Sequence, residues 1–426
     1  MPFGHHAIDP APRTYPSSVA LLKRSARRPD DDASTSTMMD VQSWLLTKAL
    51  AIDDLLTLFE EFNWRLVATG LKLDRATLHI GTLHPQLAGF SWNWEREDGL
   101  CDEIHVPTAA LEADAYLKSP LYRVLEYGEA VCIETGQEAI RAQYPLMAEL
   151  NAQGYAYYLA KPLYAGATLN NAVTIATRSP HGFDQATLEA MEPAFAAFSL
   201  HVARHTSLRV SANIANAYLG EAAGRQVLEG SIKRGHGAAA DAVIWMSDLR
   251  GFTDLADRLS AEQMALVLNS YFDVMASAVL EHGGEVLKFI GDGLLCVFPL
   301  AAFGSDRAAA RAAEQAAQTA LIRLETLNGD VSALPHIDNW RPLATGIALH
   351  SGTVFFGNVG APNRLDFTVI GKAVNAAARV EALSKSLGRP LLVTQSVAQH
   401  LDRPLVSMGT HALRGVAEPM EIFAPA

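Results

Sequence analysis

Two apolar segments that flank a Gly-Asp-Gly tip constrain the fold of the C-terminal half most strongly. The segments lie within residues 285–299, and the tip places Asp292 between Gly291 and Gly293. Their β-branched and aromatic residues predict two strands. A further segment, AVIWMSD, predicts a buried strand that ends in Asp248. A single aspartate of this kind is usually a turn former. A converging pair of carboxylates beside glycine suits Mg²⁺ or Mn²⁺.

The segments around these two aspartates alternate between helical and strand patterns. The predicted order is a turn with two helices over residues 249–284, a helix over 301–328, two strands over 340–360, a strand end with a helix over 364–388, and closing strands in PLLVTQSV and HALRGVAEPMEIFAP. This order predicts an α/β fold with a mixed sheet and helices packed mainly on one face.

The N-terminal half has a different pattern and contains no chemical motif. Residues 1–37 are rich in Pro, Arg, Asp, Ser and Thr, which predicts a disordered tail. Residues 38–205 predict helix, strands, helix, strands and helix in that order, which is typical of an α+β module with a central antiparallel sheet. Residues 206–240 predict a helical linker, which either transmits a change in packing or acts as a spacer.

The element order of residues 38–205, together with the segments YYLAKPLY and NNAVTIAT, resembles a GAF-type ligand-binding domain. The resemblance implies a sensor for an unknown small-molecule or protein regulator. Five aromatic residues could line a pocket or form ordinary core, namely Trp92, Trp94, Tyr155, Tyr157 and Tyr158. Three histidines of this half, His79, His84 and His105, do not have metal-ligand spacing.

Composition disfavours several classes of function. The chain of 426 residues has 34 Lys plus Arg and 46 Asp plus Glu, which gives a net charge of -12. This charge disfavours non-specific electrostatic binding to nucleic acid or anionic membranes. Three cysteines without a CxxC pair disfavour a disulfide scaffold and a cysteine zinc site. The sequence has no apolar run of the roughly 20 residues that a membrane span needs, and no secretory signal pattern. We expect a cytoplasmic protein of two or three domains.

Three motifs within residues 241–426 resemble the catalytic domain of class III nucleotide cyclases. They are MSDLRGFT, LKFIGDGLLCVF and RLDFTVIGKAVNAAARVEAL, and they follow the family's order with similar spacing. The resemblance implies the cyclase fold, in which a mixed sheet has flanking helices. It implies attack of the ribose 3′-oxygen on the α-phosphorus, with pyrophosphate leaving. It also implies a homodimer with two equivalent sites, because two head-to-tail catalytic domains share each site in this family.

The same resemblance assigns one group of residues to metal and triphosphate. Asp248 and Asp292 correspond to the aspartates that bind two Mg²⁺ or Mn²⁺ ions, and the backbone carbonyl of Leu249 is a further ligand. Backbone amides at a helix start would contact the triphosphate, at Gly251, Phe252 and Thr253.

A second group would bind the nucleoside. Lys288 and Thr368 correspond to the residues that recognise the base, Asn375 to the residue that orients the ribose, and Arg379 to the transition-state arginine. Arg414 lies near the family's C-terminal polyphosphate contact. Asn375 and Arg379 are four residues apart, so a helix would place both on one face.

Lys288 and Thr368 favour ATP as the substrate, because lysine can donate to adenine N1, whereas guanine N1 carries a hydrogen. Guanylyl cyclases of this family usually have Glu and Cys at these positions. The Lys/Thr combination resembles a subclass that responds to bicarbonate. The alternatives to adenylate cyclase are a guanylate cyclase, an inactive nucleotide-binding regulatory module and, by its related fold, a diguanylate cyclase.

Overall fold

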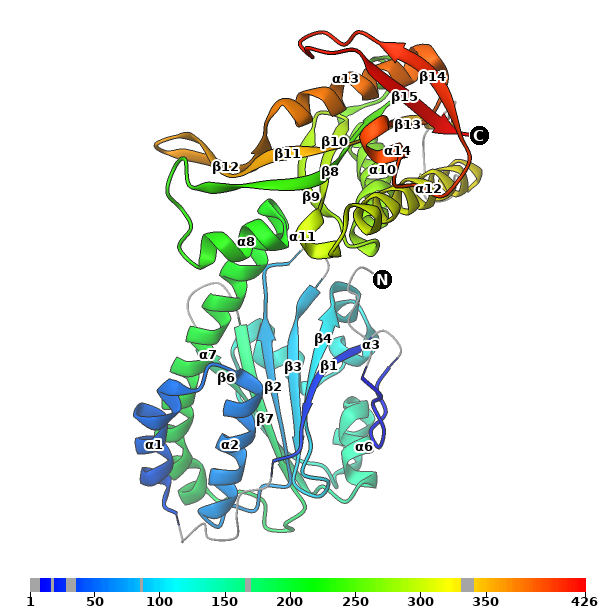
Figure 1. Cartoon of the computed structure of the whole chain (residues 1–426). Coiled ribbons are helices and arrows are strands. Elements are labelled where there is room, and N and C mark those ends of the chain that lie inside the picture. Colours follow the sequence, from blue (N-terminus) through cyan, green and yellow to red (C-terminus); the bar gives the residue numbers. More distant parts are fainter. Residues whose placement is uncertain (1–7, 17–18, 28–35, 85–86, 165–169, 331–340) are drawn as a thin grey trace. The chain divides into compact units, whose positions relative to one another are not determined.

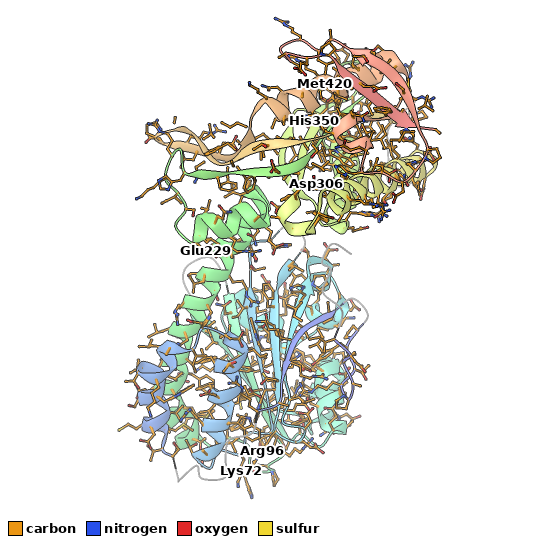
Figure 2. The ribbon with its side chains drawn as sticks, viewed as in Figure 1. Lys72, Arg96, Glu229, Asp306, His350 and Met420 are labelled. Carbon is orange, nitrogen blue, oxygen red and sulfur yellow. The ribbon has the colours of Figure 1, made fainter. Side chains whose placement is uncertain are left out.

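The structure, a computed structural model, describes residues 8–16, 19–27, 36–84, 87–164, 170–330 and 341–426. It contains two compact units, His5–Ala217 and a second that includes Tyr218–Ala426. Each unit has its own sheet with helices against it (Figure 1). Side chains fill the space between the helices and the sheet in both units (Figure 2).

The N-terminal unit is built on a seven-stranded antiparallel sheet of order β1-β4-β3-β2-β7-β6-β5. Its strands are β1 (Ala20–Ser25), β2 (Arg75–Gly81), β3 (Leu87–Glu95), β4 (Cys101–Pro107), β5 (Val131–Glu134), β6 (Tyr157–Tyr164) and β7 (Asn170–Thr177). Its helices are α1 (Met38–Leu46), η1 (Lys48–Ala51), α2 (Leu55–Ala68), η2 (Thr108–Leu111), α3 (Asp114–Leu117), α4 (Pro120–Tyr127), α5 (Glu138–Gln143), α6 (Pro145–Ala152) and α7 (Gln185–Leu219). The expected α+β module with an antiparallel sheet is present, although β4 had not been predicted.

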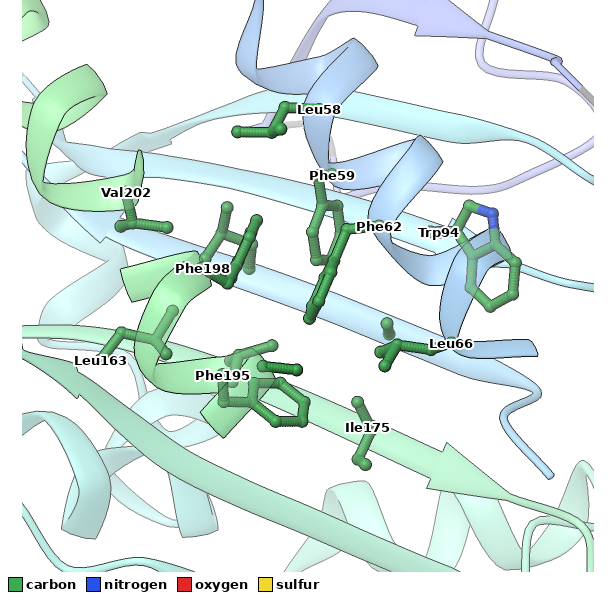
Figure 3. Close-up of a cluster of buried hydrophobic side chains, with 14 of the residues drawn as sticks. Leu58, Phe59, Phe62, Leu66, Trp94, Leu163, Ile175, Phe195, Phe198 and Val202 are labelled. Atoms are coloured by element: carbon green, nitrogen blue, oxygen red, sulfur yellow. The ribbon is translucent and has the colours of Figure 1, made fainter. Parts of the chain in front are cut away.

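The main core of this unit lies between the sheet and the helices α1, α2 and α7. Phe62 stacks on Phe198 with ring centroids 4.3 Å apart and meets Phe195 edge to face at 5.6 Å (Figure 3). Trp92 and Trp94 belong to this core and are fully buried. Their aromatic rings therefore serve packing. A second cluster on the other face joins the sheet to α4 and α6.

The prediction of a disordered tail over residues 1–37 was wrong for 8–16 and 19–27; the remaining tail positions before 36 lie outside the described residues. Strand β1 pairs with β4 at one end of the sheet. The buried Asp102 of β4 holds the segment in place. It accepts two hydrogen bonds from Arg24, at 2.6 and 2.9 Å, and one from the Tyr15 hydroxyl at 2.7 Å. The sequence pattern missed this because the partner lies more than 75 residues away.

The C-terminal unit contains an eight-stranded mixed sheet of order β14-β15-β13-β11-β8-β10-β9, with β12 paired to β11. The β11–β13 pair is parallel and the others are antiparallel. Its strands are β8 (Gly237–Leu249), β9 (Glu285–Ile290), β10 (Gly293–Pro299), β11 (Thr345–Ala361), β12 (Arg364–Ile370), β13 (Leu391–Thr394), β14 (Leu405–His411) and β15 (Met420–Pro425). Its helices are α8 (Glu221–Leu228), α9 (Phe252–Ala256), α10 (Ala261–Glu281), α11 (Leu300–Phe303), α12 (Asp306–Gly329), α13 (Lys372–Leu387) and α14 (Gln395–Ala398). This is the expected mixed sheet with flanking helices.

Helices cover both faces of this sheet, not mainly one. Helices α10 and α12 pack on the face that carries Val243 and Trp245 of β8. Helix α13 packs on the opposite face, against Ala242 and Ile244. Because both faces of β8 are apolar, each needs a cover. Helix α10 has the length and apolarity of a membrane span, but its buried residues belong to this core.

Two boundaries differ from those expected. The linker 206–240 is helical only as far as Leu228, and β8 begins at Gly237, before the expected boundary at 241. Residues 340–360, expected as two strands, contribute one long strand, β11. Glycine within β11 serves close packing, since a Cβ at Gly357 would lie 2.5 Å from the Cα of Gly237.

Candidate active site

The site begins where β8 and β10 lie side by side. Asp248 is opposite Gly293 in this antiparallel pair, and Asp292 immediately precedes Gly293. A Cβ at Gly293 would lie 3.3 Å from Oδ1 of Asp248 and 2.7 Å from the carbonyl of Ser247. Glycine is therefore required for the close approach of the two strands. The arrangement brings the two aspartates of the sequence prediction together.

The two carboxylates raise the cost of each other's charge. Partial burial, then the negative charge of Asp248, raises the pKa of Asp292 to about 6. A cation between them would relieve this repulsion. Carboxylate pairs with room for further oxygen ligands suit Mg²⁺ or Mn²⁺. In the described part of the chain, no group of three or more His, Cys, Asp or Glu side chains is arranged so that it could hold a metal ion by itself. The residues therefore fit a divalent ion that takes its other ligands from backbone, water or phosphate.

A buried hydrogen-bond chain fixes the backbone at Asp248. The Tyr271 hydroxyl donates to Oγ1 of Thr345 at 2.8 Å, and Thr345 donates to the carbonyl of Asp248 at 2.9 Å. Burial raises the pKa of Tyr271, and the charges of Asp248 and Asp292 add to this shift. The phenol therefore stays protonated as a donor. Sequence reasoning missed Tyr271 and Thr345, because their role depends on the packing of α10 against β11.

An ion pair ties α13 to the segment that follows Asp248. Nη2 of Arg250 lies 3.0 Å from Oε1 of Glu381, and both side chains are mostly buried. Burial raises the pKa of Glu381, and its bonds with Arg250 offset this only in part. Gly346 lies under this pair, since a Cβ there would come 2.0 Å from Nη2 of Arg250. Sequence reasoning did not identify Arg250, Glu381 or Gly346; Arg250 and Glu381 do lie within the quoted motifs.

The residues predicted to contact triphosphate directly follow strand β8, which ends at Leu249. Leu249 is buried, so this position can offer only its backbone. Gly251 has φ +74°, a left-handed conformation that favours glycine, and it precedes the short helix α9. Phe252 packs against the core, whereas Thr253 is exposed. The first amides of α9 lack partners within the helix.

Lys288 contacts the strand that carries Thr368. Nζ of Lys288, on β9, forms an ion pair with Asp366 of β12. Asp366 and Thr368 are two residues apart on one strand, so they share a face. Thr368 is buried. Lys288 is therefore linked to the strand of Thr368 through a carboxylate that was not predicted.

Asn375 and Arg379 are both exposed on α13, four residues apart, as the helical prediction requires. Arg414 is also exposed and lies in the loop between β14 and β15. Among the described residues, no hydrogen bond or ion pair connects these three side chains to Asp248 or Asp292.

The C-terminal unit is similar to known proteins. Residues 237–423 match the family model described as adenylate and guanylate cyclase catalytic domain. An adenylate cyclase of Anabaena cylindrica is 33% identical over 174 residues, which are 41% of this chain and 33% of that protein. Adenylate cyclase 1 of Rhizobium meliloti is 31% identical over 214 residues, 47% of this chain and 30% of that protein. This chain thus spans about a third of the length of these curated relatives.

Solved structures of an adenylyl cyclase and of a guanylyl cyclase are both similar to part of this chain. The adenylyl cyclase CyaB from P. aeruginosa is 27% identical, with a TM-score of 0.41, over 45% of this chain and 96% of that chain. The guanylyl cyclase Cya2 is 31% identical, with a TM-score of 0.39, over 45% of this chain and 93% of that chain.

Proposed function

We propose that this chain, whose residues 237–423 match the model of the adenylate and guanylate cyclase catalytic domain, converts ATP to 3′,5′-cyclic AMP and pyrophosphate. The observation that carries the proposal is the pairing of Asp248 with Asp292 at adjacent strand ends, in a chain where Lys288 also pairs with Asp366, two residues from Thr368 on β12. The first pair supplies the charge that phosphoryl transfer needs, and the second supplies a donor for adenine.

The reaction forms a bond between the ribose 3′-oxygen and the α-phosphorus and breaks the bond to the pyrophosphate oxygen; the 3′-hydroxyl proton is lost. Two Mg²⁺ or Mn²⁺ ions, held by Asp248, Asp292 and the carbonyl of Leu249, would lower the pKa of that hydroxyl and neutralise phosphate charge. The amides of Gly251, Phe252 and Thr253 would bind the triphosphate, and Arg414 would contact it further.

The protein's remaining contribution is positioning and charge. Asn375 would hold the ribose so that the 3′-oxygen faces the α-phosphorus. Arg379 would place its planar donors on the charge that develops at that phosphorus, which suits an arginine better than a lysine. Both side chains are exposed on one face of α13, and so are available to a substrate.

Substrate choice would depend on the surface formed by β9 and β12. Lys288 would donate to adenine N1, and Thr368 would complete the recognition of the base. Asp366 favours a second candidate, a guanylate cyclase, because its half-exposed carboxylate could accept from guanine N1–H once Lys288 moved away. The ion pair between Lys288 and Asp366 holds the lysine on this surface and supports ATP as the first choice.

We propose a homodimer in which each site is completed by two chains. Asn375 and Arg379 have no link to Asp248 within the described part of one chain, so a second copy would supply them. Exposed apolar side chains lie next to the base-recognition residues, namely Ile290 and Ile370. Burial of such a patch in a twofold interface would be favourable. The N-terminal unit would act as a GAF-like sensor for a regulator, and bicarbonate is a candidate activator of the catalytic domain.

The test is production of cyclic nucleotide by the purified full-length chain from ATP or GTP, with Mg²⁺ or Mn²⁺. We expect cyclic AMP from ATP. Cyclic GMP alone would refute the roles of Lys288 and Thr368, and no product with either metal, with or without bicarbonate, would favour an inactive nucleotide-binding module.

A double variant tests substrate choice directly. Lys288→Glu with Thr368→Cys should shift the preference towards GTP, because glutamate accepts from guanine N1–H. An unchanged ratio of the two products would contradict the assignment of the base-recognition surface. Lys385→Glu makes the same charge reversal on α13, away from strands β9 and β12, and serves as the matched control.

A further inference from the structure

A large cavity lies in the N-terminal unit, on the face of the sheet opposite to the core of α1, α2 and α7. Its volume is about 960 Å³, within the range of pockets that hold drug-sized ligands. Alternate residues of β2 and β3 face it, including Thr77, His79, Ser91 and Asn93. Residues of η2, α3 and α4 complete the wall.

Most of the wall is apolar. It includes Val19, Ile104, Val106, Leu111, Leu121 and Leu146. Of the five aromatic residues considered as pocket residues, Tyr158 is the one whose side chain belongs to this wall, within the described part of the chain. A cavity of this size with an apolar wall favours a ligand that leaves water readily.

The polar end of the cavity is a chain of hydrogen-bonding groups. Nε2 of His79 lies 2.8 Å from Oγ1 of Thr77, which lies 2.7 Å from Oγ1 of Thr174. Thr174 and Tyr158 both line the cavity. Burial lowers the pKa of His79 to about 4, so the imidazole is neutral at pH 7. Hydroxyls and a neutral imidazole can each donate or accept a hydrogen bond. The hydrogen bonds between these groups can therefore point in either direction, so the polar end can bind either a donor or an acceptor on a ligand.

Two charged side chains line the wall, Arg75 and Glu126. Arg75 lies 3.5 Å from Glu95, and Glu126 accepts a hydrogen bond from the Tyr116 hydroxyl at 3.0 Å. An anionic ligand would therefore meet a guanidinium that already has a carboxylate partner, and it would face the negative charge of Glu126. Burial of an unpaired charge is costly, whereas a neutral polar group can be satisfied by the hydroxyl chain.

We propose that this cavity is a binding site for a neutral, largely apolar small molecule that carries a hydrogen-bonding group at one end. The polar group contacts His79 and Tyr158, and the apolar body lies against the aliphatic wall. An anionic ligand such as a cyclic nucleotide is a poor match for the same cavity. This site is separate from the residues assigned to nucleotide cyclisation, so its test does not depend on turnover.

The experiment measures binding of a neutral fluorescent probe, N-phenyl-1-naphthylamine, to the full-length chain. Its matched anion is 8-anilino-1-naphthalenesulfonate, which adds a sulfonate to the same ring system. We expect saturable binding of the neutral probe at one site per chain, at least about tenfold tighter than the anion. Comparable binding of both probes, or displacement of the neutral probe by cyclic AMP, would overturn the proposal.

Two variants locate the site. Ser91→Phe fills the cavity from β3 and should lower the affinity for the neutral probe at least about tenfold. Ser43→Phe, on the exposed face of α1, should leave that affinity unchanged. Tyr158→Phe removes one hydroxyl and should weaken the probe about fivefold. Unchanged affinity of Tyr158→Phe for the probe would refute the proposed polar contact. The Tyr158→Phe variant also keeps the proposal testable if Ser91→Phe does not fold.

Discussion

Replacement of Gly346 by alanine tests how strand β8, which carries Asp248, is held in place. Gly346 is opposite Asp248 in the β8–β11 pair. A Cβ there would come within 2.0 Å of Nη2 of Arg250, 2.2 Å of Oγ of Ser384 and 2.5 Å of Oε1 of Glu381. Ordinary contacts are near 3.5 Å, so the methyl group must displace the ion pair by about 1 Å or more.

The expected cost follows from this overlap. Overpacking of a filled site costs about 1–3 kcal/mol, and weakening of the mostly buried ion pair adds to it. We expect a total of about 3 kcal/mol, which lowers the Tm of a unit of about 200 residues by about 6–12 °C. Since Asp248 lies opposite the new methyl group, turnover should fall at least about tenfold even where the variant remains folded.

The assays are thermal unfolding and cyclic nucleotide production at saturating ATP. Gly329→Ala is the matched control, because a Cβ at the end of α12 meets nothing within 4 Å. It should leave both quantities near wild type. If Gly346→Ala kept wild-type Tm and turnover, the claim that Arg250 and Glu381 fix the strand would be wrong.

Three further outcomes are expected. Asp248→Ala and Asp292→Ala should each abolish turnover while the chain stays folded, and full turnover in either would contradict the two-metal assignment. Arg379→Ala should lower kcat more than it weakens ATP binding, as steady-state kinetics with a nucleotide-binding assay would show. Burial alone would raise the pKa of Asp102, but the hydrogen bonds from Arg24 and Tyr15 lower this pKa overall. The ionised Asp102 therefore stabilises the folded N-terminal unit above about pH 4, and this stabilisation is lost as the pH falls further. Asp102→Asn should therefore destabilise the N-terminal unit by about 3 kcal/mol at pH 7, and urea unfolding should show that the difference shrinks below about pH 4.

The order of elements in the C-terminal unit could be predicted because local patterns determine it. The Gly-Asp-Gly tip between two apolar segments becomes the β9–β10 hairpin, and the alanine-rich segment becomes α12. The helix starts at Ser260 and Ser305 also follow local rules, since each side chain accepts a bond from a backbone amide three residues on.

The supporting contacts of the site could not be predicted in this way. Arg250 and Glu381 are 131 positions apart, and Tyr271 and Thr345 are 74 apart. Each pair meets only because β8 and β11 adopt one register with helices on both faces. A single sequence contains no local signal for such a meeting. The length of β11 was misread for a related reason, because its glycines serve contacts with distant strands.

The strand β1 has a consequence for the solubility of shortened chains. A chain that began at Met38, where the helical pattern starts, would lose β1 and expose the backbone edge of β4. It would also leave the buried carboxylate of Asp102 without its bonds from Arg24 and Tyr15. Open strand edges recruit strands from other molecules. The N-terminal segment therefore covers a strand edge that could otherwise pair with another molecule, and its removal should make the N-terminal unit more prone to self-association.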